Sequence, residues 1–167
     1  MTTQHTGAPT TDPHLAPHLP PTPRNLESAV RAVARITEDA WLPLVGYPGS
    51  DVHWRVRCLL CGWEGERFYS HLRRGRPAFR HPDCLPLEEQ QGALDAYRTA
   101  RSPECVCLFA HPTTPAAVRE VRSAIDYARR VGDLHGLMIH LVRLLGPCPA
   151  APARAEAFRA EAAQPTR

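Results

Sequence analysis

Lysine is absent from this 167-residue chain, and all 20 of its basic side chains are arginines. This preference is typical of GC-rich coding sequence, so arginine content by itself does not indicate a function. Seventeen acidic residues balance most of the positive charge and leave a net charge of +3. Such a mild average still allows a basic patch on one part of the surface.

Long apolar runs are also absent. No stretch approaches the roughly 18 apolar residues that a membrane-spanning helix needs, and the N-terminus lacks the basic-then-apolar order of a secretory signal. We therefore predict a cytoplasmic protein that does not bind membranes. In that reducing compartment, the six cysteines are expected to be metal ligands or buried thiols rather than disulfides.

The length is that of one domain with tails. Residues 1–23 contain six prolines and few bulky apolar side chains. Burial therefore cannot offset the entropy of ordering them, and we predict a disordered tail. We expect a zinc-binding domain with an N-terminal helix over residues 24–100, a helical region over 101–148 and a flexible tail over 149–167.

Hydrophobic periodicity predicts an α+β fold. Apolar residues at helical spacing indicate helices, and Trp54 and Val56 alternating with arginines indicate a half-buried strand. Asn25 is the expected N-cap of the first helix. The pattern predicts helices over about residues 25–39, 85–101, 114–131 and 133–146, and strands over residues 53–58 and 105–110.

The densest functional signal lies between residues 58 and 84. Cys58 and Cys61 form a Cys-x2-Cys pair, and after nineteen intervening residues His81 and Cys84 form a second close pair. Zinc prefers four nitrogen or sulfur donors in a tetrahedron, and two such pairs let two turns each supply half of it. Gly62 falls where the first turn needs an unhindered backbone. We predict a structural Zn²⁺ site made by these four ligands.

The predicted order of strand, cysteine knuckle, hairpin and helix is similar to a treble-clef zinc finger. The stretch AWLPLVGYPGSDVHWRVRCLLCGWEGERFYSHLRRGRPAFRHPDC resembles treble-clef modules of actinobacterial and actinophage proteins, which run from a Tyr-Pro-Gly turn through a Trp to a Cys-x2-Cys-Gly knuckle. The resemblance covers residues 40–84. It implies a small treble-clef zinc finger, flanked here by an N-terminal helix and a C-terminal helical hairpin. His81 stands where these modules more commonly have cysteine.

Several alternatives to this metal site stay open. His71 could replace His81 as the fourth donor, or the Cys-x2-Cys pair could serve redox or iron–sulfur chemistry, although the residues after Cys61 are unlike those of a thioredoxin-type motif. Treble-clef nucleases use a hairpin histidine to activate water, a role open to His71. The helix after Cys84 has no histidine or asparagine to complete such a site, so we expect no enzyme activity.

A second metal site is a weaker hypothesis. Cysteines separated by one residue, with distant further donors, form a loose pattern, and buried cysteine often serves as a small hydrophobe. The four residues concerned are Cys105, Cys107, His111 and Cys148.

The metal-binding stretch is rich in arginine. Its arginines are Arg55, Arg57, Arg67, Arg73, Arg74, Arg76 and Arg80, against Glu64, Glu66 and Asp83. These seven positive and three negative charges leave an excess of four. Because a guanidinium forms two hydrogen bonds with one phosphate, we predict an Arg-rich hairpin at 67–80 that binds nucleic acid, DNA rather than RNA. The alternative is that these arginines are solvated or paired with nearby glutamates.

The segment LHGLMIHLVRLL, residues 134–145, is too apolar to be a DNA-recognition helix. Its apolar stripe predicts packing against the preceding helix or against a partner subunit. A second function therefore stays open, in which the zinc is purely structural and the C-terminal helices mediate protein interaction or self-association. The stripe consists of Leu134, Leu137, Met138, Leu141, Leu144 and Leu145.

Overall fold

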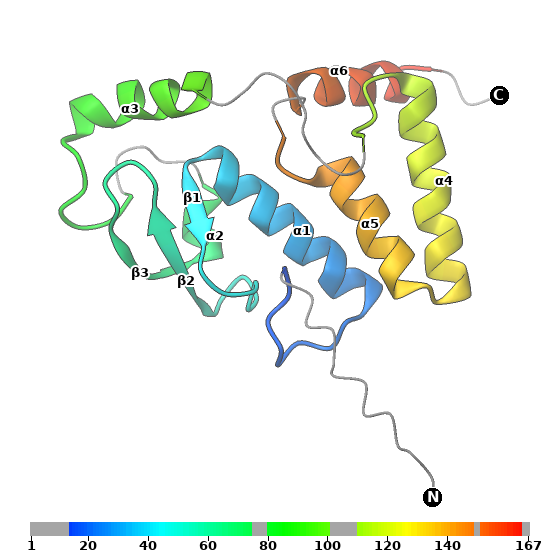
Figure 1. Ribbon diagram of the computed structural model, residues 1–167, viewed down its shortest axis with the longest axis horizontal. Coiled ribbons are helices and arrows are strands. Elements are labelled where there is room, and N and C mark those ends of the chain that lie inside the picture. The colour runs from blue at the N-terminus through cyan, green and yellow to red at the C-terminus, as the bar shows by residue number, and fades with distance from the viewer. Residues whose placement is uncertain (1–13, 75–79, 101–109, 149–150, 165–167) are drawn as a thin grey trace, which may run out of the picture.

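The computed structural model describes residues 14–74, 80–100, 110–148 and 151–164. Over these residues the chain is α+β, with six helices and one three-stranded antiparallel sheet (Figure 1). In chain order the elements are α1 (Pro23–Glu38), β1 (Trp41–Pro43), β2 (His53–Cys58), β3 (Glu64–Phe68), α2 (Tyr69–Leu72), α3 (Leu87–Ala100), α4 (Pro115–Val131), α5 (Leu134–Leu145) and α6 (Ala151–Ala162). None of these helices is both long and apolar enough to cross a membrane.

Helix α1 lies at the centre of the molecule, between the sheet and the C-terminal helices (Figure 1). It contacts β1 on one side and α5 on the other. Trp54 and Val56 of β2 are fully buried, and so are Leu137 and Leu141 of α5, at no more than 1% exposure each. All four belong to one apolar core. This core therefore extends across both the 24–100 and the 101–148 regions.

The sheet has the strand order β1-β2-β3. Trp41 of β1 pairs with Cys58 of β2, and Trp54 of β2 pairs with Arg67 of β3. The predicted strand over residues 53–58 is confirmed, because Trp54 and Val56 enter the core while Arg55 faces solvent. The sheet thus carries the first ligand pair at the end of its central strand.

Residues 14–22, predicted to be disordered, pack against the loop between β1 and β2. Leu15 and Ala16 are only 6% and 7% exposed. The Tyr47 N–H donates to the His14 carbonyl at 2.7 Å, and the Ala16 N–H donates to the Tyr47 carbonyl at 3.1 Å. The prediction is wrong for this segment because Leu15 finds an apolar neighbour that sequence composition does not reveal. Residues 1–13 lie outside the described residues.

Gly46 permits this packing, since a β-carbon at residue 46 would lie 2.5 Å from the Leu15 carbonyl carbon. We expect Gly46→Ala to displace residues 14–16 and to lower the free energy of unfolding by about 1–3 kcal/mol. Gly92→Ala is the matched control, because its added carbon meets nothing within 4 Å inside α3 and should stabilise by about 0.5–1 kcal/mol. Urea denaturation measures both variants, and an unchanged midpoint for Gly46→Ala would contradict the packing.

The caps of the helices follow ordinary rules, with one correction. Thr22, not the predicted Asn25, caps α1: its Oγ1 accepts from the Asn25 N–H at 3.2 Å, and Pro23 occupies the first turn. Thr114 caps α4 in the same way, and Gly132 ends that helix with φ 71°. The predicted helical hairpin of α4 and α5 is therefore present.

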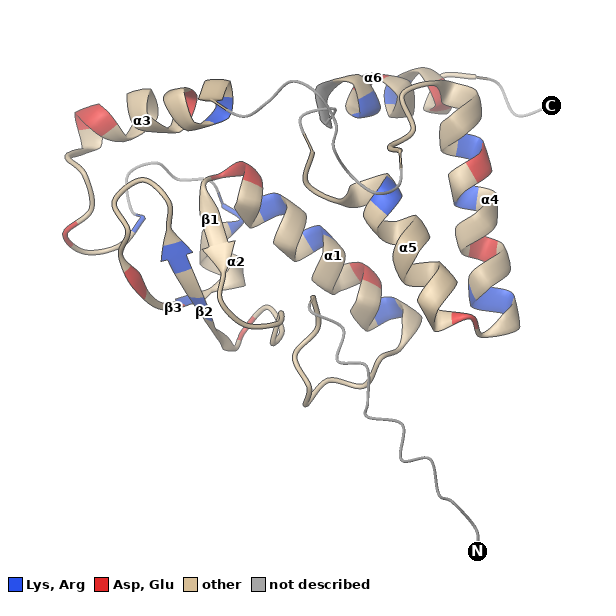
Figure 2. Ribbon diagram, in the orientation of Figure 1, with Lys and Arg blue, Asp and Glu red and all other residues tan. Residues whose placement is uncertain are grey.

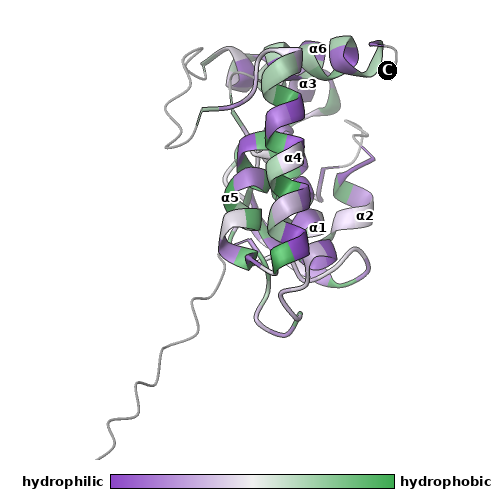
Figure 3. Cartoon of the chain, turned by 90° about the vertical axis from the view of Figure 1, so that its right-hand side faces the viewer, coloured by the Kyte–Doolittle hydropathy of each residue, from purple (hydrophilic) through white to green (hydrophobic). Residues whose placement is uncertain are grey.

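The apolar stripe of α5 is used inside the molecule. Leu137, Leu141 and Leu144 are buried, whereas Leu134 is 39% exposed. Helix α5 contacts both α4 and α1, and Figure 3 shows α4 alternating between hydrophilic and hydrophobic residues along its length, as an amphipathic helix does. Packing against the preceding helix, one of the two predicted roles of the stripe, is thus confirmed. The predicted strand over residues 105–110 falls almost entirely outside the described residues.

Helix α6 occupies most of the predicted flexible tail, so that prediction is wrong for residues 151–162. Ala157 is buried at 4% exposure. Arg122 of α4 bonds Glu161 at 2.7 Å and lies 4.9 Å from the Phe158 ring centroid. Alanine favours helix, but a helix of this length is marginal in water by itself. Contact with α4 is therefore what holds it.

Candidate metal centre

A tight turn after β2 presents the first ligand pair. The Gly62 N–H donates to the Cys58 carbonyl at 2.8 Å, and the Cys58 N–H donates to the Trp63 carbonyl at 2.8 Å. Gly62 has φ 84°, a left-handed conformation that glycine adopts at little cost. The turn therefore forms where the Cys-x2-Cys-Gly pattern predicts it.

The second pair lies in the turn that leads into α3. Asp83, between His81 and Cys84, has φ 58°, a left-handed conformation that aspartate tolerates better than most residues. His81 is buried at 5% exposure, while Cys84 is half-buried. This turn brings both side chains to the end of β2.

Cys58, Cys61, His81 and Cys84 place one donor atom each within 4.8 Å of one another. The Cys61 Sγ lies 3.1 Å from the His81 Nε2 and 3.9 Å from the Cys84 Sγ. With Zn–S bonds of about 2.3 Å, two sulfurs of a tetrahedral zinc site are about 3.8 Å apart. Within the described ranges, this is the one cluster able to hold a metal ion. His71, on α2, is not part of it.

The hydrogen bonding of His81 prepares it to bind a metal. Its Nδ1 lies 2.6 Å from the Pro82 carbonyl. Because a carbonyl only accepts, Nδ1 carries the hydrogen and Nε2 presents its lone pair to the cluster. Trp63 stacks on the ring at 4.3 Å with an interplanar angle of 7°. Burial lowers the pKa of His81 and, with the charges of Arg67 and Arg80, outweighs the Pro82 bond that raises it.

The thiol groups of Cys58 and Cys84 affect each other's pKa, because two thiolates close together repel each other. Burial raises the pKa of Cys58, but the hydrogen bond and charge of Arg80, with the N–H groups of Leu60 and Cys61, outweigh it and leave the pKa below its usual value. Burial and the negative charge of Cys58 raise the pKa of Cys84 to about 11. A divalent cation removes this conflict because it stabilises all the thiolates together. The donor set fits a metal ion and could bind zinc.

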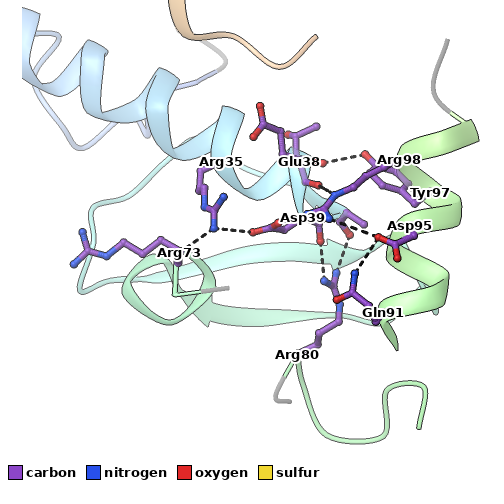
Figure 4. Close-up of polar contacts among 11 residues, drawn as sticks. Arg35, Glu38, Asp39, Arg73, Arg80, Gln91, Asp95, Tyr97 and Arg98 are labelled. Carbon is purple, nitrogen blue, oxygen red and sulfur yellow. Dashed lines mark hydrogen bonds and ion pairs between the residues drawn. The ribbon is translucent and has the colours of Figure 1, made fainter. Parts of the chain in front are cut away.

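Arg80, next to His81 in the chain, contacts the segment at the C-terminal end of α1 (Figure 4). Its guanidinium donates to the Asp39 carbonyl at 2.7 Å and to the Ala40 carbonyl at 3.0 Å. It also lies over the Trp41 ring, 4.3 Å from the centroid. The last carbonyls of a helix lack intrahelical donors and carry a partial negative charge. Arg80, the residue before His81, therefore binds the C-cap carbonyl of α1 at Asp39 and the next carbonyl along the chain.

Helix α3 is attached to the same end of α1 (Figure 4). The Tyr97 hydroxyl donates to the Thr37 carbonyl at 3.0 Å. Arg98 donates to the Glu38 carbonyl at 3.3 Å and forms an ion pair with the Asp39 carboxylate at 3.0 Å. Sequence reasoning missed this network, since its partners are 40 or more residues apart and no motif links them.

The predicted phosphate-binding arginines do not form one surface. Arg55 and Arg57 on β2 are paired with Glu64 on β3, which is the alternative that the sequence left open. Arg67 is half-buried and donates to the Arg80 carbonyl. The assignment of Arg80 needs correction, because it is 8% exposed and its guanidinium is bound to the carbonyls of Asp39 and Ala40, just after α1. Arg76 lies outside the described residues.

Arg73 and Arg74 are exposed at the end of α2. In the described part of the predicted hairpin, residues 67–74, the chain forms the end of β3 followed by α2, whereas β2 and β3 form the hairpin. The Arg73 guanidinium lies 6.0 Å from the Tyr69 ring centroid, and its carbonyl accepts from Arg35 at 3.5 Å. Neither arginine has an ion pair within the described ranges. They are the predicted arginines best placed to meet a ligand.

The hypothesis of a second metal site receives no support from the described residues. His111 Nδ1 lies 2.6 Å from the Arg143 carbonyl and 3.0 Å from the Arg154 guanidinium. Cys148 is buried at 2% exposure. Neither belongs to a cluster of potential ligands in the part of the chain that the structure describes, and Cys105 and Cys107 lie outside that part.

No protein-family model matches this chain, and comparison with curated proteins and with solved structures gave no match either. The similarity to treble-clef modules therefore stays a prediction. The α+β class and the four-residue Cys/His cluster are confirmed from the structure alone.

Proposed function

We propose that this chain is a nucleic-acid-binding protein, with DNA as its partner, in which a zinc ion stabilises a treble-clef-like module. Zinc is the proposed ion because three thiolates and one imidazole are a common structural zinc shell. Four protein donors leave no position for an activated water. The role of the ion is therefore to hold the β2–β3 hairpin and the turn before α3 together.

The observation that carries the proposal is the placement of Arg73 and Arg74. Both follow α2, the short helix after β3 of the hairpin whose turn carries Cys58 and Cys61, both are exposed, and neither has an ion pair within the described ranges. Arginine binds phosphate through a planar fork of donors, and rigid support lowers the entropic cost of that contact. Residues held next to a metal-stabilised hairpin have such support.

Neutralising these two arginines tests the proposal. We expect Arg73→Gln with Arg74→Gln to weaken duplex DNA binding about tenfold and to reduce the slope of log K against log salt by about two, because each lost phosphate contact releases about one fewer counterion. Fluorescence anisotropy between 50 and 200 mM salt measures both quantities. Arg55→Gln is the control, since Arg55 is paired with Glu64. Binding that does not depend on salt would contradict the proposal.

A protein-interaction adaptor is the second candidate. Tyr127, Val131 and Leu134 are 61%, 53% and 39% exposed where α4 turns into α5. Neighbouring exposed apolar side chains are typical of protein-interaction surfaces. A nuclease has no supporting observation within the described ranges, because His71 lies outside the metal cluster.

A further inference from the structure

A furrow lined by arginines follows α1 from α6 to α2. It consists of three adjoining hollows of about 740, 300 and 350 Å³. Arg31 of α1 lines all three, Glu27 and Arg129 line the first two, and Leu145 lines the first and the third. Shared lining residues make the three hollows one continuous feature, which we call the arginine furrow.

Positive charge dominates the arginine furrow. Its charged lining consists of Arg24, Arg31, Arg35, Arg73, Arg122, Arg129 and Arg159, against Glu27, Glu38 and Asp126. Seven positive and three negative charges leave an excess of four, against +3 for the whole chain. The arginines come from α1, α4 and α6, where Figure 2 shows basic residues, and from the segment after α2. These arginines are far apart in the chain, so their common surface could not be predicted from the sequence.

Some of these charges are paired and some are not. Glu27 contacts Arg31 at 3.0 Å and Arg129 at 2.5 Å, and Glu161 contacts Arg122 at 2.7 Å. Glu27 and Glu161 are 28% and 15% exposed while their arginine partners are 39–59% exposed, so a phosphate can reach these arginines from the solvent side and compete with the carboxylates. Arg24, Arg73 and Arg159 are exposed and have no ion pair within the described ranges. They leave the arginine furrow able to bind an anion along its whole length.

The floor of the arginine furrow is apolar and contains aromatic rings. Leu145, Phe158 and the buried side chains of Ile125, Leu141 and Leu144 line the largest hollow, and Tyr69 lines the hollow next to α2. Leu145, Phe158 and Tyr69 are half-buried, so these three are the floor residues that a base can reach. An arginine lies over each ring, Arg122 at 4.9 Å from Phe158 and Arg73 at 6.0 Å from Tyr69. A basic groove with aromatic side chains is the arrangement that binds single-stranded nucleic acid, whose bases are free to stack. A duplex keeps its bases stacked inside and offers this floor only phosphates.

We propose that the arginine furrow binds a single strand of nucleic acid, with phosphates on its arginines and bases on its apolar floor. This inference rests on the proposed function and adds two things to it. It names the form of the partner, a single strand, and it extends the contact surface from Arg73 along α1 to α6.

Three arginines far from the metal cluster test the path of the strand. In the variant with Arg24→Gln, Arg31→Gln and Arg159→Gln, we expect single-strand affinity to fall at least tenfold. The slope of log K against log salt should fall by about two, at about 0.7 per lost contact for single strands. Arg119→Gln and Arg130→Gln on α4 are matched controls, because neither residue lines the arginine furrow, and should change neither quantity.

One aromatic ring tests the contact with bases. We expect Phe158→Leu to lower single-strand affinity about fivefold or more, because stacking on the ring is lost. The salt slope should stay unchanged, since no charge is removed. Leucine keeps the apolar contact with α4, and circular dichroism confirms that the variant is folded.

The probes are one mixed-sequence oligonucleotide as single-stranded DNA, as RNA of the same sequence and as duplex DNA, measured by fluorescence anisotropy. Tighter binding of either single strand than of the duplex supports the inference. Equal or tighter duplex binding, or an unchanged triple variant, overturns it. The proposed function survives that result if the Arg73 and Arg74 variant still loses affinity. A last competitor is polyglutamate, added at the same concentration of negative charge as the oligonucleotide. If polyglutamate displaces the single strand, the inference is overturned, because the arginine furrow then binds any polyanion.

Discussion

Removing the metal ion is expected to abolish the fold of the sheet and of the turn before α3. Structural zinc contributes about 10–16 kcal/mol of apparent binding free energy in finger peptides at neutral pH, as much as the whole stability of an ordinary domain. Here the ion would gather the end of β2 and the turn before α3, and β3 itself buries little apolar surface. The core shared by α1, α4 and α5 should keep part of its helical structure.

Tryptophan fluorescence and metal content measure this effect. Trp63 and Trp41 both contact the ligand His81, so chelation should change their emission while circular dichroism reports the remaining helix. We expect Cys84→Ser to lose stoichiometric zinc and to behave as the chelated protein does. Cys148→Ser is the matched control, because Cys148 is a buried free thiol outside the cluster, and it should keep its zinc.

Two results would contradict this prediction. The first is purified protein that carries no stoichiometric zinc when grown with the metal. The second is a Cys84→Ser variant with unchanged tryptophan emission and an unchanged urea midpoint. Either would show that the four side chains lie close together without depending on an ion.

Arg80→Ala is expected to lower the free energy of unfolding by about 3 kcal/mol. The change removes charge-assisted bonds to the carbonyls of Asp39 and Ala40, each worth about 1.5–3 kcal/mol. It also removes the guanidinium from the face of Trp41. The Asp39 carbonyl would lose this bond at a buried helix end, and a buried acceptor without a donor costs free energy.

Arg80→Lys and Arg74→Ala separate a structural role from a phosphate-binding one. Lysine keeps the charge at residue 80 but cannot span two carbonyls with a planar fork, so we expect it to recover less than half of the loss. Arg74→Ala should leave stability within about 0.5 kcal/mol of the parent and lower nucleic-acid affinity. Urea denaturation and DNA titration of the three variants show whether the two effects separate. A stable Arg80→Ala variant that loses only DNA affinity would contradict the structural role.

The metal cluster could be predicted from the sequence because its signal is local. Cys58 and Cys61 are one turn apart, and so are His81 and Cys84, so spacing alone identifies two half-sites. Burial of Trp54 and Val56 likewise follows from their alternation with polar residues. In each case the residues that decide the structure are neighbours in the chain.

The use of each arginine could not be predicted, because partners distant in the chain decide it. Arg80 bonds to the carbonyls of Asp39 and Ala40, 41 and 40 residues earlier, and Arg57 meets Glu64 only once the hairpin has formed. Leu15 and α6 were missed for the same reason, since their partners are Gly46 and α4. From local composition both segments are predicted to be tails. In the structure, contacts with distant parts of the chain order them.

Helix α1 lies next to the metal cluster at its C-terminal end and lines the arginine furrow along its length. Arg80 bonds to the two carbonyls just after its C-terminal end, while Arg24, Arg31 and Arg35 line the arginine furrow from earlier turns. Its 16 residues make a rod about 24 Å long. Packing against β1 and α5 holds this rod in place, so the contact with Arg80 at one end and the side chain of Arg24 at the other are kept apart by roughly the length of the helix.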